Sequence, residues 1–588
     1  MTSFRVEEVL LTPEAVDAWS MTDPRLRNWP VVYALDGASK VYVGESRNVT
    51  VRFRQHMDNP DRRELVRGRV VVDDEFNKSA CLDLESYLIR LFAGDGTYTV
   101  LNRNDGIVDA DYFQRDRYQA RFDEVFQELR ELGLFTRTVR EIENSDLFKL
   151  SPFKALTIDQ ATAVETILEG LFEDLDHERS SRSVIQGDPC TGKTVVAIYL
   201  LKLLMDIKAA DPADPSDSDT VFSDFFTPGY PERLRGFRAA LVIPQQSLRR
   251  SVERVFRKTP GLTEAMVLSP FDVGRSDTDF DLLVVDETHR LNQRANQSSG
   301  VRNTDFREIN ERLFGQDSSS FTQLDWIISR SRHQIFLVDK AQSVRPADLP
   351  PAVLDPLLDA ARATDRWYPL TSQLRVRAGE DFIAYVRAVL DGSQRTPQAF
   401  AGYDLRMFDD LAALKTEIDA RESEHGLARL VAGYAWPWKS RKDKTAHDIE
   451  LDGLALRWNT TDVDWVSAPT SRHEVGSIHT IQGYDLNYVG VIIGRDLRWD
   501  GAAGRIAFDR SRYFDKKGME NNKQLGVTYS DADLLRYVTN IYSVLLTRGI
   551  RGTYLYVCDE ALREHFRPFF PPAGSAPTND PRTTRRVQ

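Results

Sequence analysis

The apolar residues of this chain fall into short runs, and the way these runs alternate with polar residues changes near residue 156. Upstream of it, alternating segments at 31–35 and 41–43 flank Asp36-Gly37. This arrangement is typical of a β-hairpin, because glycine tolerates the positive φ of a tight turn. A helix is predicted over 82–92. The pattern therefore predicts a small mixed α+β domain at the N-terminal end.

Downstream of residue 156, continuous apolar runs alternate with helix-like segments. Such runs are typical of the central strands of a parallel sheet that is covered on both faces. One series comprises 184–185, 239–243, 282–285 and 334–338, and a second comprises 427–431, 489–493 and 553–557. The sequence therefore predicts an α/β protein with two parallel-sheet lobes in tandem.

The 588 residues are too many for one core and indicate about three domains. We expect the domain boundaries where the pattern changes. They delimit an N-terminal extension (1–27), a first domain (28–110), a helical connector (111–150), a first lobe (151–345), a second lobe (346–570) and a disordered tail rich in Pro, Thr and Arg (571–588).

The composition excludes several classes of protein. No stretch approaches the ~18 apolar residues of a membrane span, and the first residues lack the apolar centre of a signal peptide. The cysteines Cys81, Cys190 and Cys558 are too few for a disulfide framework and fit a reducing compartment. We therefore expect a cytoplasmic protein with no membrane partner.

The net charge of −12 argues against binding of polyanions over the whole surface. A local basic groove is nevertheless enough to bind nucleic acid. Two candidate segments are 52–69, with six arginines, and the lysine-rich 439–444. Charged runs of this kind are more often a solvated face, so each is only a hint.

Residues 187–194 match the complete phosphate-binding loop pattern. They are Gly187, Asp188, Pro189, Cys190, Thr191, Gly192, Lys193 and Thr194. An apolar run precedes the loop and an amphipathic segment follows it, so that loop N–H groups and a helix dipole would face a phosphate. Lys193 would reach the β- and γ-phosphates, and the Thr194 hydroxyl would ligate Mg²⁺. The sequence therefore predicts an ATP site rather than a chance glycine-rich turn.

Other segments supply the remaining groups of an ATPase site. Asp286 and Glu287 follow an apolar run, where Asp286 would coordinate Mg²⁺ and Glu287 would activate the attacking water. The amide of Gln160 can pair with the edge of adenine, and Gln342 would sense the γ-phosphate or its water.

Two arginines complete this set of candidates. Arg375 and Arg548 each end a short segment in the later part of the chain. Contributed across a cleft, they would stabilise charge on the transferring phosphoryl group. A single arginine is more often a surface residue, but the pair in this order favours a functional role.

The order of these segments resembles superfamily-one helicases, and most of all the bacterial helicase-like ATPases related to the C-terminal domain of Schlafen proteins. The resemblance covers roughly 150–560 and includes two more specific segments, 432–438 and 476–485. It implies two RecA-like lobes with ATP in the cleft. It also implies that Thr480, Gln482 and Gly483 couple DNA contacts to ATP turnover. Thr288 differs from the Ala or Cys that many helicases carry, which makes hydrolysis more credible than unwinding.

A second ordered series lies within 28–110 and resembles the GIY-YIG nucleases. It consists of Val31-Val32-Tyr33, Val41-Tyr42-Val43-Gly44, Arg52, His56, Glu85 and Asn102. Val31-Val32 replaces the Gly-Ile of the first motif, and Val43 replaces the Ile of the second. The four-residue spacing of Arg52 and His56 places both on one helix face.

The resemblance implies phosphodiester hydrolysis with Mg²⁺ or Mn²⁺. Glu85 would hold the metal ion and Arg52 would stabilise the pentacovalent phosphate. Tyr33 or Tyr42 would activate or position water with help from His56, and these roles stay open. Asn102 would support the fold rather than the chemistry.

The two series together predict an ATP-driven DNA translocase or helicase fused to a metal-dependent endonuclease. In bacteria such a fusion suggests DNA processing or anti-phage defence, with DNA as the expected partner. The alternative is an ATP-gated sensor of nucleic acid whose N-terminal domain only docks. A metabolic kinase would leave the segments around Arg375, Gln482 and Arg548 without a role. The oligomeric state is open.

Overall fold

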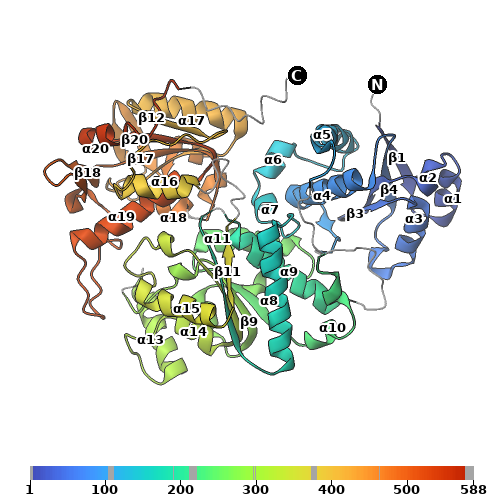
Figure 1. Ribbon diagram of the computed structural model, residues 1–588, viewed down its shortest axis with the longest axis horizontal. Helices are drawn as coiled ribbons and strands as arrows, with labels where there is room; N and C mark the ends of the chain where they lie inside the picture. Colours follow the sequence, from blue (N-terminus) through green and yellow to red (C-terminus); the bar gives the residue numbers. More distant parts are fainter. Residues whose placement is uncertain are drawn as a thin grey trace. The chain divides into compact units, whose positions relative to one another are not determined.

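The computed structural model describes residues 4–103, 111–189, 191–210, 221–295, 297, 299–371, 381–461, 464–481 and 483–575. The chain forms two compact units, whose helices and strands are labelled in Figure 1. The first unit comprises Met1–Phe172, Val195–Gly236 and Ser251–Met266, and the second comprises Glu173–Thr194, Phe237–Arg250 and Val267–Gln588.

The first unit contains a five-stranded sheet. Its strands are β1 (Phe4–Leu10), β2 (Val31–Asp36), β3 (Lys40–Ser46), β4 (Arg67–Asp73) and β5 (Thr99–Val100), in the order β1-β4-β2-β3-β5. All neighbours are antiparallel except β3 and β5. The predicted hairpin is confirmed, because β2 pairs with β3 and the Gly37 N–H donates to the Lys40 carbonyl at 3.0 Å.

The first eleven helices of the described residues are α1 (Pro13–Ser20), α2 (Arg25–Asn28), α3 (Val49–Asp58), α4 (Lys78–Asp95), α5 (Arg115–Glu131), α6 (Val139–Glu143), α7 (Asp146–Lys149), α8 (Ile158–Asp176), α9 (Lys193–Ala209), α10 (Tyr230–Arg233) and α11 (Gln246–Lys258). Of these, α1 to α5 cover the two faces of the five-stranded sheet. Successive side chains of a strand point to opposite faces. Val32 and Ala34 therefore join an apolar core with α4 and α5, while Val31, Tyr33 and Leu35 join another with α1, α2 and α3.

Two expected boundaries in this region are wrong. The predicted extension, 1–27, is part of the domain because β1 pairs with β4 from Phe4 to Leu10. The predicted connector, 111–150, also belongs to it, since α5 buries Phe122 and Phe126 in the core beside α4. Both segments have an apolar face whose exposure to water is unfavourable. The first packs on the sheet and the second packs on α4, which buries these faces.

The second unit contains two parallel sheets, as predicted. The strands of the first sheet are β6 (Ser181–Gly187), β7 (Ala239–Val242), β8 (Val267–Leu268), β9 (Phe280–Val285), β10 (Ser331–Val338) and β11 (Trp367–Leu370), in the order β11-β6-β10-β9-β7-β8. Every neighbouring pair is parallel. The first lobe extends past the predicted boundary at 345, because β11 pairs with β6.

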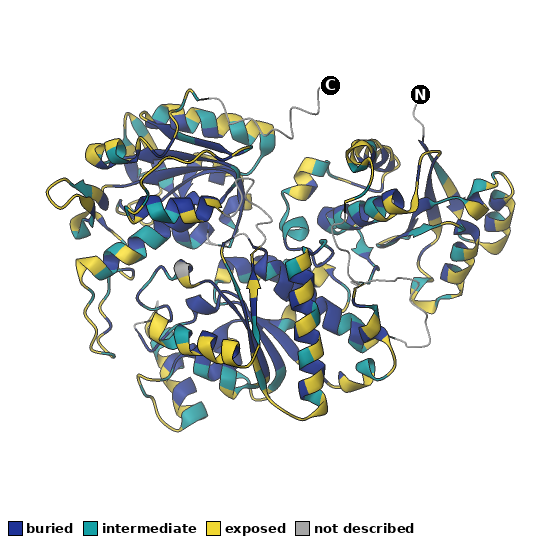
Figure 2. Ribbon diagram, viewed as in Figure 1, coloured by how far each residue is buried: buried dark blue, intermediate teal, exposed yellow. Residues whose placement is uncertain are grey.

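The second parallel sheet has seven strands. They are β12 (Asp404–Phe408), β13 (Ala428–Ala432), β14 (Ile449–Leu451), β15 (Leu454–Trp458), β16 (Glu474–Gly476), β17 (Leu486–Ile493) and β20 (Gly549–Val557), in the order β12-β20-β17-β13-β16-β15-β14. Only β14 and β15 run antiparallel. A separate hairpin joins β18 (Leu497–Asp500) to β19 (Arg505–Phe508). In Figure 2 most strands of both parallel sheets are dark blue, as expected for buried apolar runs.

Nine helices of the described residues follow α11. They are α12 (Pro270–Arg275), α13 (Gly300–Phe314), α14 (Gln323–Ser329), α15 (Pro351–Ala363), α16 (Asp381–Leu390), α17 (Leu411–His425), α18 (Ile478–Ile481), α19 (Asp531–Leu546) and α20 (Glu560–Phe566). None of the helices in the described part of the chain combines the length and the apolar character that a bilayer crossing requires.

The predicted tail begins too early at residue 571. The Met407 N–H donates to the Pro571 carbonyl at 2.7 Å, and Met407 forms a parallel bridge with Pro572. These contacts place the start of the tail beside β12. Residues 576–588 lie outside the described residues.

One buried carboxyl, in the turn between β17 and β18, makes stability depend on pH. Asp496 is fully buried, and its Oδ1 accepts a hydrogen bond from the Tyr542 hydroxyl at 2.7 Å. Burial raises the pKa of Asp496 to about 7. Between roughly pH 4 and 7 the folded chain therefore binds a proton that the unfolded chain releases. The stability that this group contributes at low pH is lost as the pH rises.

We expect Asp496→Asn to flatten this pH dependence. The amide oxygen can still accept from Tyr542, and an amide does not ionise. The melting temperature of the variant should exceed that of the wild type by roughly 2 °C or more at pH 8, since 1 kcal/mol shifts it by about 2–4 °C. Thermal unfolding at pH 5 and pH 8 measures this. An equal loss of stability in both proteins between these pH values would contradict it.

Candidate nucleotide and nuclease sites

The phosphate-binding loop has the predicted strand–loop–helix setting. It leaves β6 at Gly187, and α9 begins at Lys193 after Gly192, whose φ of +80° suits glycine. The Lys193 Nζ donates to the carbonyls of Gly187 and Asp188 at 2.7 and 2.8 Å. The ammonium group is therefore bonded to its own loop and lies where a phosphate would compete for it.

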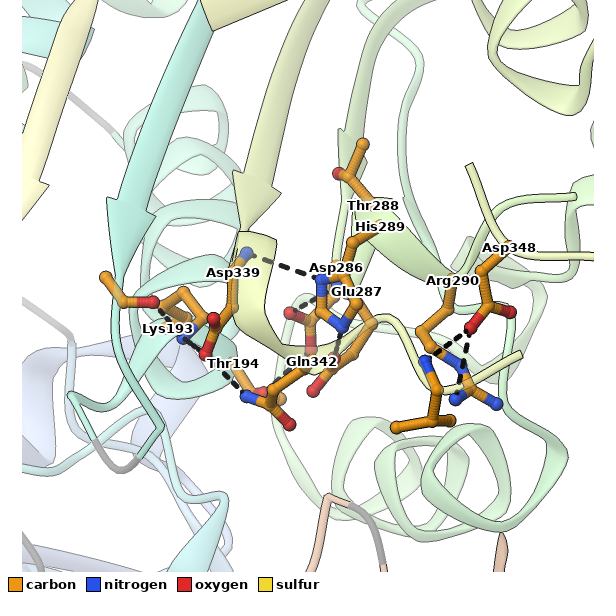
Figure 3. A network of polar contacts seen from close by, with 12 residues as sticks. Lys193, Thr194, Asp286, Glu287, Thr288, His289, Arg290, Asp339, Gln342 and Asp348 are labelled. Carbon is orange, nitrogen blue, oxygen red and sulfur yellow. Dashed lines mark hydrogen bonds and ion pairs between the residues drawn. The ribbon is translucent and has the colours of Figure 1, made fainter. Parts of the chain in front are cut away.

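Two carboxylates follow β9, as predicted, and Figure 3 shows their contacts. Asp286 Oδ2 accepts a hydrogen bond from the Thr194 hydroxyl at 2.7 Å, and Asp286 Oδ1 accepts one from the Glu287 N–H at 2.9 Å. Both side chains are buried. Glu287 has a φ of +49°, a strained conformation for a non-glycine residue that is common at functional sites.

The two carboxylates have opposite electrostatic environments. Burial, and then the charge of Glu287, raises the pKa of Asp286. Burial would also raise the pKa of Glu287, but His289 and Lys193 hold it below its usual value. The positive charge near Asp286 is thus too small to offset its burial, whereas the positive charge near Glu287 keeps that carboxylate ionised. A carboxylate and a hydroxyl oxygen are the hard ligands that Mg²⁺ prefers, so Asp286 and Thr194 fit this ion.

His289 connects the carboxylate pair to the end of β10. Its Nε2 lies 2.9 Å from Glu287 Oε2, and its Nδ1 accepts from the Asp339 N–H at 3.3 Å. Asp339 Oδ2 accepts from Gln342 Nε2 at 2.7 Å and lies 3.8 Å from the Lys193 Nζ. These contacts, drawn in Figure 3, join the phosphate loop, the carboxylates and β10 in one network.

The network continues to the second parallel sheet. Arg548, between α19 and β20, donates from Nη2 to Gln342 Oε1 at 3.0 Å and is buried. An arginine from the second lobe thus joins the network, and its role in phosphoryl transfer stays a prediction. Its positive charge helps to lower the pKa of Glu287.

The structure thus brings most of the predicted nucleotide-site residues together. They are Asp188, Lys193, Thr194, Asp286, Glu287, Gln342 and Arg548. Pro189 and Thr191 complete the described loop, and the Thr191 hydroxyl donates to the Asp188 carbonyl at 2.9 Å. Cys190, Arg375 and Gln482 lie outside the described residues.

Other predicted residues have mainly local partners. Gln160 is buried in the first unit, where its Oε1 accepts from the Thr157 N–H at 3.1 Å, and its adenine-binding role stays a prediction. The Thr480 hydroxyl is buried and caps α18 through the Ser477 N–H at 3.0 Å. The Thr288 hydroxyl donates to the Val285 carbonyl at 3.0 Å.

Two charged residues at this site, His289 and Arg387, were not predicted from the sequence. His289 follows the recognised acidic pair but had no assigned role. Arg387 lies in α16, and its Nη1 donates to Asp188 Oδ1 at 2.8 Å. Its position within an ordinary amphipathic helix offers no local pattern that would identify it.

The predicted nuclease residues also lie together, around β2, β3 and α3. The Tyr33 hydroxyl is 2.8 Å from His56 Nε2, and the Tyr42 and His56 ring centroids are 4.8 Å apart. Gly44 lies opposite Tyr33 in the hairpin, where a Cβ would be 2.3 Å from the tyrosine hydroxyl. Only glycine at this position lets the Tyr33 ring cross β3 to reach His56.

Arg62 is a further member of this cluster that sequence reasoning missed. Its guanidinium lies 4.2 Å from the centroid of the Tyr42 ring and contacts His56 Nδ1. Because a guanidinium can only donate, Nδ1 accepts and Nε2 carries the histidine proton toward Tyr33. Burial, and then the charges of Arg62 and Arg52, lowers the pKa of His56 to about 2, so the ring is neutral at ordinary pH.

The two tyrosines are not free bases. Burial raises the pKa of both Tyr33 and Tyr42 above the usual value, and Glu85 adds to the rise. Arg52 hydrogen-bonds to both hydroxyls and opposes the shift. Arg52 of α3 and Glu85 of α4 therefore lie close enough to both tyrosines to influence the pKa of their hydroxyls. Their roles in a nuclease site stay predictions.

Asn102 has the supporting role that the sequence predicts. Its Oδ1 accepts from the Val43 N–H at 3.1 Å, and its Nδ2 donates to the Val43 carbonyl at 2.7 Å. The side chain thereby satisfies both backbone groups of a buried residue of β3. It stabilises the strand that carries Tyr42 and Gly44 without facing the cluster's hydroxyls.

Three known proteins are similar to about two thirds of this chain. A relative, an uncharacterized protein of Saccharomyces cerevisiae, is 25% identical over 443 residues, which are 70% of this chain and 90% of that protein. A solved arterivirus helicase, nonstructural protein 10, shares 10% identity with a TM-score of 0.26, over 68% of this chain and 64% of its own. The Pif1 helicase from Bacteroides, solved with ADP-AlF3 and single-stranded DNA, shares 10% identity with a TM-score of 0.23, over 67% and 91%.

A family comparison gives the firmest assignment. Residues 180–559 match the family described as Schlafen group 3, DNA/RNA helicase domain. This range contains both parallel sheets and the whole network around Lys193 and Asp286. Because the match covers more than half of the 588 residues, the chain belongs to the Schlafen group 3 DNA/RNA helicase domain family.

Proposed function

We propose that this protein is an ATP-driven nucleic-acid translocase of the helicase type, fused to a metal-dependent endonuclease. The observation that carries the first part is the network from Lys193 and Asp286 through Gln342 to Arg548. It connects a phosphate-binding loop to an arginine of the second sheet. DNA is the expected partner, and DNA processing or antiviral defence is the expected role.

ATP and Mg²⁺ fit the side chains at the first site. Thr194 and Asp286 would hold Mg²⁺, which neutralises charge on the β- and γ-phosphates when bound. Lys193 would exchange the carbonyls of Gly187 and Asp188 for phosphate oxygens. Glu287, kept ionised by His289 and Lys193, would accept a proton from the attacking water.

The contacts between the two sheets supply a route for coupling. Asn540 Nδ2 donates to the Ser343 carbonyl at 2.9 Å, beside the Gln342–Arg548 contact. The Tyr484 hydroxyl donates to the Ser247 carbonyl at 3.2 Å, next to the segment that the resemblance assigns to DNA contacts. A change at the γ-phosphate would therefore reach the second sheet at both points, which is what translocation requires.

The N-terminal cluster supports phosphodiester hydrolysis. Arg52 would bind the phosphate with its planar fork, and the protonated Tyr33 and Tyr42 would orient water by hydrogen bonds. Glu85 would hold Mg²⁺ or Mn²⁺ together with water and the substrate phosphate, as one carboxylate often does for Mg²⁺. His56 would keep Tyr33 in place through the 2.8 Å contact.

The alternative is an ATP-gated sensor whose N-terminal domain docks without cutting. It is favoured by the net charge of −12 and by Val31-Val32, which replace the Gly-Ile of the first nuclease motif. Weak ATP turnover that does not depend on the length of single-stranded DNA would support the sensor. Turnover that rises with strand length would support translocation.

Two substitutions test the ATPase separately from ATP binding. We expect Lys193→Ala to abolish both, because it removes the cation that faces the phosphates. Glu287→Gln should keep ATP binding and lower the rate of phosphate release by about 100-fold or more, since a general base contributes roughly 10²–10⁴-fold. Equilibrium binding of a fluorescent ATP analogue and phosphate release would be measured in parallel. Hydrolysis at the wild-type rate in Glu287→Gln would contradict the assigned role.

A second pair of substitutions tests the nuclease. Cleavage of supercoiled plasmid with Mg²⁺ or Mn²⁺ should be lost in Glu85→Ala and in Arg52→Ala, since these remove the metal ligand and the phosphate cation. ATP hydrolysis should survive in both. The control is Glu128→Ala on the exposed face of α5. Retained cleavage in both Glu85→Ala and Arg52→Ala, or none in the wild type with either metal, would favour the docking alternative.

A further inference from the structure

Arg387 approaches the phosphate loop from an element that has no recognised motif. The apolar face of α16 packs into the core of the second sheet through Phe382, Tyr385, Val386 and Val389. Arg387 projects from the same helix to Asp188, where its Nη1 donates to Oδ1 at 2.8 Å. The second sheet therefore contributes a cation to the phosphate loop in addition to Arg548.

The contact with Asp188 does not use all the N–H donors of the Arg387 guanidinium. Its Nη2 lies 4.0 Å from Asp339 Oδ1, beyond hydrogen-bond distance. Its Nε is buried and has no hydrogen-bond partner among the described residues. A buried N–H without a partner is costly, and a ligand with several acceptor oxygens would satisfy it.

The position of Arg387 relative to Asp339 places it beside Lys193. The Lys193 Nζ lies 3.8 Å from Asp339 Oδ2, while Arg387 approaches Oδ1 of the same carboxylate. Two cations thus converge on one carboxylate at the loop that would receive the triphosphate. Lysine and arginine side chains are the groups that usually contact a terminal phosphate.

Asp188 is the unusual element of this arrangement. It places a carboxylate inside a loop that would bind a polyanion, and its side chain is 50% exposed. The Asp188 carboxylate and the phosphates of ATP are both negative and repel each other, so an unpaired Asp188 would weaken ATP binding. The ion pair with Arg387 neutralises the carboxylate and at the same time keeps the arginine close to the phosphate position.

We propose that Arg387 is a phosphate-contacting residue of the ATP site and that Asp188 holds it in the nucleotide-free protein. When ATP binds, the guanidinium exchanges the Asp188 carboxylate for oxygens of the terminal phosphate, which fit its planar fork equally well. This inference rests on the proposed ATP binding. It adds a second arginine from the second sheet, on a different element from Arg548.

The test is equilibrium binding of fluorescent ATP and ADP analogues to the full chain, measured by anisotropy. Arg387→Ala should weaken ATP binding about tenfold or more and change ADP binding less than about threefold, because ADP lacks the terminal phosphate. Arg387→Lys should fall between Arg387→Ala and the wild type, since an ammonium keeps the charge but not the fork. The matched control is Arg395→Ala, an exposed arginine in the loop after α16.

Asp188→Asn supplies an independent readout. It removes the competing carboxylate and should tighten ATP binding in the wild-type background, with a smaller effect when combined with Arg387→Ala, because the two side chains act as a pair. Thermal unfolding would establish that each variant is folded. Equal losses of ATP and ADP affinity in Arg387→Ala, or ATP binding as tight as in the wild type, would overturn the inference.

The outcome also separates this inference from the proposed function. A wild-type chain that fails to bind ATP, or binds it no better than Lys193→Ala does, overturns the proposed function and this inference together. A wild-type chain that binds ATP in a Lys193-dependent manner, with Arg387→Ala unaffected, overturns only the role of Arg387.

Discussion

The arrangement of the nucleotide site depends on two adjacent carboxylates, Asp286 and Glu287, buried at the end of one strand. The carboxyl ends of parallel strands lie along one edge of their sheet. The segments that follow β6, β9 and β10, which are the phosphate loop, the two carboxylates and Asp339, therefore lie close together. Two like charges in a buried position are unfavourable unless other groups compensate for them. Thr194, Lys193 and His289 provide this compensation, which explains why the polar residues here form one network.

The compensation is incomplete in a way that fits the proposed chemistry. Burial and the charge of Glu287 raise the pKa of Asp286 more than its hydrogen bonds lower it. A bound cation would therefore stabilise the Asp286 carboxylate. Glu287 stays ionised because nearby positive charge lowers its pKa, so its carboxylate can accept a proton from water. Gln342 and Arg548 carry the same network to the second sheet, which links the state of the site to the position of a second lobe.

The sequence predicted the local features of the fold and the positions of the candidate site residues on their strands and helices, and failed where contacts between distant segments determine the structure. Buried strands such as β9 and β17 are visible as continuous apolar runs, and the loop from Gly187 to Thr194 has its own pattern. By contrast, β1 and β11 acquire their place only by pairing with β4 and β6, so the expected boundaries at 27 and 345 were wrong. Arg62 and Arg387 were missed for the same reason, since only folding brings them to His56 and Asp188.

We propose that ATP binds at the carboxylate network and that its binding changes the dynamics of the second lobe near Arg548. Hydrogen–deuterium exchange of the full chain, with and without a non-hydrolysable ATP analogue and Mg²⁺, tests both halves at once. We expect slower exchange of the backbone amides in the phosphate loop, around Asp286 and Glu287, and also at the end of α19 near Arg548. Protection confined to the first sheet would contradict the coupling, and unchanged exchange at the phosphate loop would contradict ATP binding at this site.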